Sequence, residues 1–166
     1  MKKLSHALLI VCFALVSWQT ISTKNQTPEF SPETLMKTLK DSGIIFPDIV
    51  WSQSALETGF WESKVFSENN NLFGMKQARV RENTATGTRY GHATYEDWLQ
   101  SVIDYKLWQK NHRIDSNTTR ESYFKLLSKV YCKTPGYVSQ VKKLVLRAKS
   151  IEKDLNVAEE PIVTSL

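Results

Sequence analysis

The segment IVWSQSALE, residues 49–57, is the most informative part of the sequence. Its apolar side chains cover more than one stripe of the helix that it predicts, as in a helix enclosed by protein on several sides. Glu57 closes this segment, and the residues TGFW follow at positions 58–61. A carboxyl group at the end of a mostly dry helix, flanked by aromatic side chains, lies where desolvation raises its pKa. Glu57 is therefore a candidate general acid.

A second segment, NNNLFGMK at residues 69–76, runs from polar amides directly into an apolar turn. A sugar-binding groove needs amides that hydrogen-bond to hydroxyl groups and aromatic faces that stack on pyranose rings. We expect Asn71 and Phe73 to contact a saccharide, and Tyr95 and Trp98 are further candidates. The competing interpretation makes these four residues a cap, two packing aromatics and a core indole. Together the two segments predict a cleft that cleaves saccharides.

The N-terminal residues have the pattern of a secretory signal peptide, which we place at residues 1–23. Two lysines follow the first methionine, and an apolar run, ALLIVCFALV, occupies positions 7–16. This run is well short of the ~20 residues that span a bilayer, so no stable membrane span is expected after processing. The sequence then predicts one domain over residues 24–155 and a disordered tail over residues 156–166. We expect an exported protein, periplasmic or secreted.

The charge and the cysteine content narrow the class of protein. The formal charge of +5 falls to +3 without Lys2 and Lys3, and no basic stripe or known module indicates nucleic-acid binding. Cys132 would be the only cysteine of the processed chain, so the fold depends on packing rather than on an intramolecular disulfide. His92 and His112 do not lie at metal-ligand spacing. We expect a monomer that uses no metal and no cofactor.

Helical patterns dominate the rest of the chain, with one interruption. Ser31-Pro32-Glu33 predicts the start of a helix, and Gly43 ends that helix. Residues 71–92 are rich in turns and short alternating stretches, which favour a small hairpin-like lobe. Further helices are predicted over residues 47–58, 94–108, 118–130 and 137–151. The predicted fold class is α+β and mainly α, a helical bundle with a small β-lobe.

Four motifs in series resemble those of the glucosaminidase domain of glycoside hydrolase family 73, over about residues 31–152. They are ALETGF at 55–60, NNLFGMK at 70–76, YEDW with SVIDY within 95–105, and YCKTPGY at 131–137. The resemblance implies a lysozyme-like fold in which the β-lobe flanks an active-site cleft. It also implies cleavage of the β-1,4 bond between N-acetylglucosamine and N-acetylmuramic acid in the glycan strands of peptidoglycan. Glu57 takes the position of the family's general acid.

The resemblance defines the second catalytic group less well. Family members often carry a further acid in the β-lobe, where Glu82 is the only carboxylate between Glu68 and Glu96. The neighbours of Glu82 match no motif of the family, so a solvated loop residue is the favoured interpretation. Tyr131 and Tyr137 resemble a pair of tyrosines, of which the first is a catalytic candidate and the second a substrate-binding one. Inverting, retaining and substrate-assisted mechanisms all stay open.

Three alternatives to a glucosaminidase remain at this point. A lytic transglycosylase needs one acid and no activated water, which fits the missing second carboxylate, although Thr58 stands where that class usually has a serine. A muramidase would cleave the other glycosidic bond of the same glycan. A catalytically inactive wall-binding module would bind the polymer and hydrolyse nothing.

Overall fold

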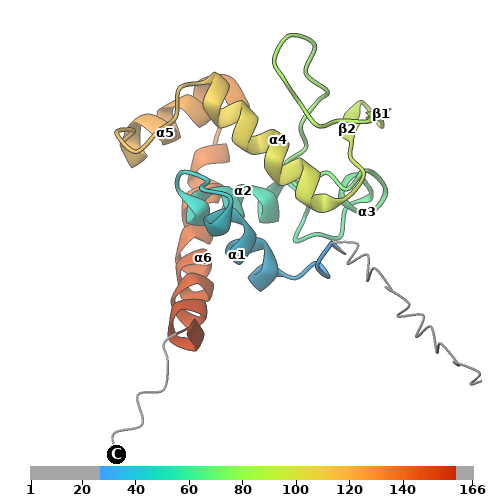
Figure 1. The fold of residues 1–166 in the computed structure, drawn as a ribbon. Coiled ribbons are helices and arrows are strands. Elements are labelled where there is room, and N and C mark those ends of the chain that lie inside the picture. Colours follow the sequence, from blue (N-terminus) through green and yellow to red (C-terminus); the bar gives the residue numbers. More distant parts are fainter. Residues whose placement is uncertain (1–26, 160–166) are drawn as a thin grey trace, which may run out of the picture.

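The computed structural model describes residues 27–159, so the predicted signal peptide lies outside the described residues. Over this range the chain is mainly helical with one small antiparallel sheet, which confirms the predicted fold class (Figure 1). Every helix in this range is too short or too polar to span a bilayer. The elements are α1 (Pro32–Asp41), α2 (Pro47–Glu57), α3 (Lys64–Asn69), β1 (Gly87–Arg89), β2 (His92–Thr94), α4 (Trp98–Asn111), α5 (Arg120–Leu126), the π-helix η1 (Leu127–Tyr131) and α6 (Tyr137–Glu159).

Helix α2 packs against both α1 and α6, and Figure 1 shows α1 and α2 beside the long α6. Every residue from Asp48 to Ala55 is buried, as expected for a helix enclosed on several sides. The Trp51 indole is fully buried, and its Nε1 donates to the carbonyl of Pro32 at 2.9 Å. The buried Asp48 carboxylate accepts two hydrogen bonds from Arg120, at 2.9 and 2.8 Å. Packing and paired polar groups together fix the helix that ends at Glu57.

The predicted N-cap accounts for the start of α1, and a glycine accounts for the end of α2. Ser31 Oγ accepts from the Thr34 backbone N–H at 3.0 Å, and Thr34 Oγ1 accepts from the Ser31 N–H at 2.6 Å. This reciprocal pair satisfies two backbone donors that the helix itself leaves free. Helix α2 ends at Glu57, and Gly59 follows with a φ of 57°. The left-handed conformation at Gly59 closes the helix as a C-terminal glycine does.

The β-lobe is smaller than the sequence predicts. Strands β1 and β2 pair antiparallel, with Gly87 opposite Thr94 and a turn at Tyr90 and Gly91. The alternating segment 79–81, for which extended structure was expected, lies in a bend instead. Backbone groups of this loop bond to side chains rather than to a neighbouring strand, as described below for Asn83. The hairpin was predicted, and its extent was not.

Several helix boundaries also differ from expectation. Helix α4 begins at Trp98 rather than near Thr94, because Asp97 Oδ1 accepts from the Gln100 N–H at 3.0 Å and so caps the helix there. The short α3 was not predicted, and α5 continues into a π-helical turn that includes Tyr131. Helix α6 runs to Glu159, so it includes the first residues of the segment assigned to the tail, and residues 160–166 lie outside the described range.

Candidate active site

Glu57 is the last residue of α2 and opens onto a cavity of about 430 Å³. The cavity lies where four segments, distant in sequence, come together: the end of α2, the loop after α3, the C-terminal part of α4 and the end of η1. Glu57 is the only carboxylate among the lining residues that the structure describes. The lining residues are Glu57, Phe73, Gly74, Met75, Lys76, Gln77, Ala78, Arg81, Trp108, Val130, Tyr131 and Cys132.

Burial raises the pKa of the Glu57 carboxyl above its ordinary value. Removing a carboxylate from water disfavours the charged form, and at Glu57 this effect exceeds two opposing ones. The Tyr137 hydroxyl donates a hydrogen bond to the carboxyl, and His92 lies close enough to act through its charge; both lower the pKa. The net shift favours the protonated acid, which is the form that can donate a proton.

A buried network of polar side chains holds Tyr137 against Glu57. Gln53 Nε2 donates to the Tyr137 hydroxyl oxygen at 3.1 Å, and the Tyr105 hydroxyl donates to Gln53 Oε1 at 2.6 Å. The Tyr105 and Tyr123 hydroxyls are 2.7 Å apart. Burial raises the pKa of Tyr123 to about 12, and it also raises the pKa values of Tyr105 and Tyr137. These phenols therefore stay protonated near neutral pH and act as hydrogen-bonding groups.

The turn at Gly74 brings the backbone against the Glu57 carboxyl. Gly74 has a φ of 60°, and a Cβ atom at this position would lie 3.2 Å from Glu57 Oε2. Asn71, which is fully buried, holds the turn: its Nδ2 donates to the carbonyls of Met75 and Ala93, at 2.9 Å each. Its Oδ1 accepts from the backbone N–H of Met75 at 3.2 Å. Glycine is thus required here for both its conformation and its size.

The first residue of β2, His92, supports the same turn. Its Nδ1 lies 2.8 Å from the carbonyl oxygen of Gly74. Because a carbonyl only accepts hydrogen bonds, Nδ1 carries the proton of this contact. The β-lobe therefore reaches the acid through two residues, His92 and Gly74.

Aromatic side chains form one wall of the cavity. Trp108 and Tyr131 meet edge to face, with ring centroids 5.3 Å apart and an interplanar angle of 87°. The Tyr131 hydroxyl donates to the backbone carbonyl of Phe73 at 2.5 Å, which ties η1 to the Gly74 turn. Burial raises the pKa of Tyr131 well above its ordinary value. These two rings close one side of the cavity.

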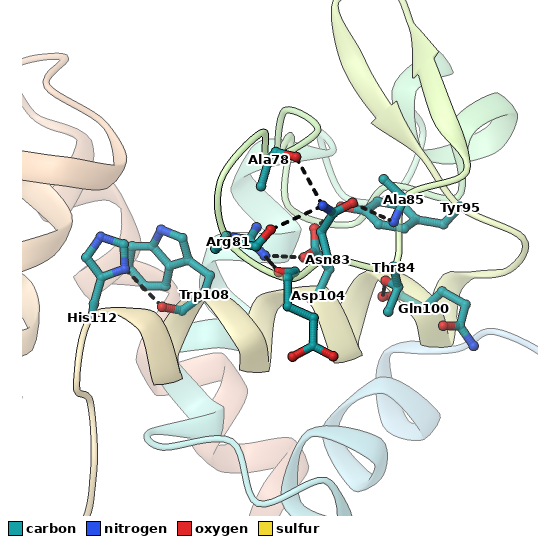
Figure 2. Close-up of polar contacts among 11 residues, drawn as sticks. Ala78, Arg81, Asn83, Thr84, Ala85, Tyr95, Gln100, Asp104, Trp108 and His112 are labelled. Atoms are coloured by element: carbon teal, nitrogen blue, oxygen red, sulfur yellow. Dashed lines mark hydrogen bonds and ion pairs between the residues drawn. The ribbon is translucent and has the colours of Figure 1, made fainter.

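A buried ion pair joins the loop 76–86 to helix α4 (Figure 2). Arg81 Nη1 lies 2.5 Å from Asp104 Oδ1, and the Tyr95 hydroxyl donates to Asp104 Oδ2 at 2.6 Å. The Asp104 side chain is fully buried, and that of Arg81 is 12% exposed. Asn83 organises the loop itself, because its Nδ2 donates to the Ala78 carbonyl at 3.0 Å. Arg81 thereby has a fixed position on the cavity wall.

Of the residues predicted for the site, three line the cavity: Glu57, Phe73 and Tyr131. Tyr137 lies outside the lining and donates a hydrogen bond to Glu57.

The other predicted residues lie elsewhere. Asn71 and Tyr95 are buried and hydrogen-bonded within the protein, outside the lining. Trp98 is also buried, where its Nε1 donates to the carbonyl of Pro28 at 3.0 Å. Glu82 is exposed and lines a separate pocket next to Lys110. The structure therefore brings together only part of the predicted set.

Sequence reasoning missed other residues around Glu57. Lys76, Arg81 and Trp108 line the cavity, and His92 acts on Glu57 through its charge. Gly74 and Lys76 stand within a motif that drew attention for its other members, and Trp108 was expected only as the last residue of the helix predicted over 94–108. For Arg81 no local signal exists, since its partner Asp104 is distant in sequence.

Among the described residues, no group of histidine, cysteine and acidic side chains could hold a metal ion.

Comparisons with known proteins give the family. The sequence model for glucosaminidase, described as mannosyl-glycoprotein endo-beta-N-acetylglucosaminidase, matches residues 33–150. The chain belongs to this glucosaminidase family. Membership places it among the glycoside hydrolases, and the matched range contains every residue that lines the cavity.

Two further comparisons complete this result. No curated protein matches the sequence. Among solved structures, this glucosaminidase-family chain is similar to the catalytic domain of the autolysin Auto from Listeria monocytogenes, with 14% sequence identity and a TM-score of 0.48. The similarity covers 76% of this chain and 89% of that one.

Proposed function

We propose that this protein is a peptidoglycan hydrolase that cleaves the β-1,4 bond between N-acetylglucosamine and N-acetylmuramic acid. The observation that carries the proposal is the placement of Glu57: a half-buried carboxyl with a raised pKa, facing a cavity, in a chain of the glucosaminidase family. The cavity offers one acid beside an aromatic wall and a backbone turn, which suits proton donation to a bound glycosidic bond.

In this mechanism Glu57 is the general acid. Its proton passes to the bridging oxygen as the bond from that oxygen to the anomeric carbon breaks, and the leaving sugar departs with a neutral hydroxyl group. Glu57 is then a carboxylate, and the hydrogen bond from Tyr137 stabilises that charged form. General acid catalysis of this kind contributes about 10²–10⁴-fold in rate.

The second group is the acetamido group of the substrate itself. No carboxylate besides Glu57 lines the cavity in the described part of the chain, and the high pKa of Tyr131 excludes it as a base near neutral pH. The acetamido oxygen attacks the anomeric carbon in place of a carboxylate nucleophile. Water then adds to that carbon and opens the cyclic intermediate, and its proton passes to the Glu57 carboxylate, which restores the acid. This route retains the β configuration. Proton NMR of the first product checks this, and an α anomer contradicts it.

The test is digestion of purified peptidoglycan by the wild type and by Glu57→Gln, followed by mass spectrometry of the fragments. We expect reducing N-acetylglucosamine ends, and a loss of at least about 100-fold in rate for Glu57→Gln. Glu62→Gln, at an exposed position outside the cavity lining, is the matched control and keeps full activity.

The same digestion separates the alternatives. Anhydro-muramyl ends indicate a lytic transglycosylase, and reducing N-acetylmuramic acid ends indicate a muramidase. A wild type that binds the polymer and releases no fragments is an inactive wall-binding module, which refutes the proposal. A hydrolase of this substrate acts outside the cytoplasm, so we also propose that the protein is exported and acts as a monomer on glycan strands.

A further inference from the structure

Two basic side chains, Lys76 and Arg81, line the same cavity as Glu57. Lys76 follows the Gly74 turn by two residues and is exposed. Within residues 27–159, its ammonium group takes part in no hydrogen bond, ion pair or cation–π contact. The cavity that holds the acid therefore also presents an uncompensated positive charge.

Arg81 differs from Lys76 because its position is fixed. Its Nη1 donates to Asp104 Oδ1 and to the carbonyl of Glu82, at 2.5 and 2.7 Å. A guanidinium carries five N–H donors, and no hydrogen bond within the described residues uses its Nε or Nη2. Asp104 offsets the charge of Arg81, so this residue contributes oriented donors, and Lys76 contributes the net charge. Figure 2 shows Arg81 beside Asp104, above helix α4.

Neither cation is among the groups that shift the pKa of Glu57, which responds to burial, Tyr137 and His92. A nearby positive charge would favour the ionised form of the acid and would weaken proton donation. The placement of Lys76 and Arg81 avoids that effect. These two residues can thus attract an anion to the cavity while the pKa of Glu57 stays raised.

We propose that Lys76 and Arg81 form a subsite for a carboxylate of the substrate. The inference rests on the proposed function, since it assumes that the glycan occupies this cavity. N-acetylmuramic acid carries a lactyl ether whose carboxylate is free wherever the peptide stem has been removed, whereas N-acetylglucosamine carries no such group. Charge-assisted hydrogen bonds to a carboxylate are about twice as strong as neutral ones. The enzyme therefore prefers glycan strands that bear free lactyl carboxylates.

The test compares two forms of one polymer: glycan strands freed of their peptide stems, and the same strands with the lactyl carboxylates converted to methylamides. For the wild type, we expect kcat/KM to be higher on the carboxylate form. Lys76→Gln lowers the ratio of the two kcat/KM values about 3- to 10-fold, because one partly exposed charged contact is lost. Lys76→Glu reverses the preference. The control Lys64→Gln, at an exposed position outside the cavity lining, keeps the wild-type ratio.

Two results overturn the subsite: equal kcat/KM of the wild type on both polymers, or an equal loss on both polymers in Lys76→Gln. A wild type that hydrolyses neither polymer refutes the proposed function instead. In that case the binding of the two polymers to Glu57→Gln decides about the subsite separately. A preference for the carboxylate form that Lys76→Gln removes supports it, and equal binding refutes it.

Discussion

A methyl group at position 74 would lie 3.2 Å from Oε2 of Glu57. Gly74→Ala therefore has two effects: an alanine in the left-handed region costs about 1–2 kcal/mol, and its Cβ displaces the carboxyl group. We expect the activity to fall at least about tenfold, since small misplacements of a catalytic group reduce the rate strongly. Hydrolysis rates and thermal unfolding, measured on the same preparation, check both effects.

Gly91→Ala is the matched control for this change. Gly91 has a φ of 73°, and its Cβ would meet no atom within 4 Å. The backbone strain is therefore similar at the two positions, and the contact with Glu57 is made only at position 74. We expect both variants to lose stability. Only Gly74→Ala should also lose hydrolytic activity, because only its Cβ displaces the Glu57 carboxyl. Equal activity of the two variants would show that the turn does not position Glu57.

At the scale of single residues, the sequence predicts that Glu57 faces a cleft better than it predicts the residues around Glu57. Glu57 was identified because an apolar helix and aromatic neighbours lie next to it in the chain. His92 bonds to the carbonyl of Gly74, and the turn at Gly74 lies against the Glu57 carboxyl. Only the folded chain creates these contacts. Asn71 illustrates the same limit: its amide was expected to contact a sugar, and in the fold it bonds to backbone groups of the turn.

The loop 76–86 is joined to helix α4 by a buried ion pair, besides a hydrogen bond from Thr84 Oγ1 to the carbonyl of Gln100 at 2.6 Å. Arg81→Met leaves the Asp104 carboxylate, which is fully buried, without its cation. Removing one partner of a buried pair costs about 3–5 kcal/mol, whereas replacing both partners by apolar residues costs much less. We therefore expect the double variant with Asp104→Leu to be more stable than Arg81→Met alone. Chemical denaturation of the two single variants and the double variant gives the coupling free energy.

A surface pair provides the comparison. Lys37 and Asp41 lie one turn apart on α1, with 55% and 65% of their side chains exposed. Exposed pairs of this kind contribute about 0–1 kcal/mol, so Asp41→Asn changes the stability little. A coupling free energy for Arg81 and Asp104 no larger than that of the surface pair would mean that the loop is held by other contacts.

At the scale of elements, periodicity predicts the long helices and fails in the lobe. Apolar spacing and capping residues locate α1, α2, α5 and α6 because these signals are local. The loop 76–86 is stabilised by side-chain bonds from Asn83 and by Arg81, which reaches across to α4. An alternating pattern in such a loop resembles a strand, since the contacts that replace the strand are not local. The π-helical turn that carries Tyr131 likewise has no periodic signal of its own.

At the scale of the whole molecule, the acid site is built where separate parts of the chain converge. Helix α2 carries Glu57, the β-lobe supports the Gly74 turn, and α4 and η1 supply Trp108 and Tyr131. The same convergence that forms the cavity removes Glu57 from water. The raised pKa of Glu57 therefore affects the stability of the entire fold, because ionising its buried carboxyl is unfavourable only in the folded state.

The folded-state pKa of Glu57 is raised above its ordinary value of 4.5. Well below pH 4.5 the carboxyl is protonated in the folded and the unfolded chain. The contribution of the buried, protonated Glu57 to the free energy of unfolding is then fully present. As the pH rises through the raised pKa, the folded chain binds more protons than the unfolded one, so the free energy of unfolding decreases. Glu57→Gln lacks this decrease, because the amide does not ionise.

We therefore expect Glu57→Gln to be more stable than the wild type near neutral pH and similar to it near pH 4. Urea unfolding of both proteins between pH 4 and pH 8 measures the difference, in which the contributions of all other carboxylates cancel. The exposed Glu62→Gln should give a difference that is nearly independent of pH. If the advantage of Glu57→Gln stays constant or shrinks as the pH rises, the carboxyl group is not desolvated in the folded protein, and its pKa is not raised.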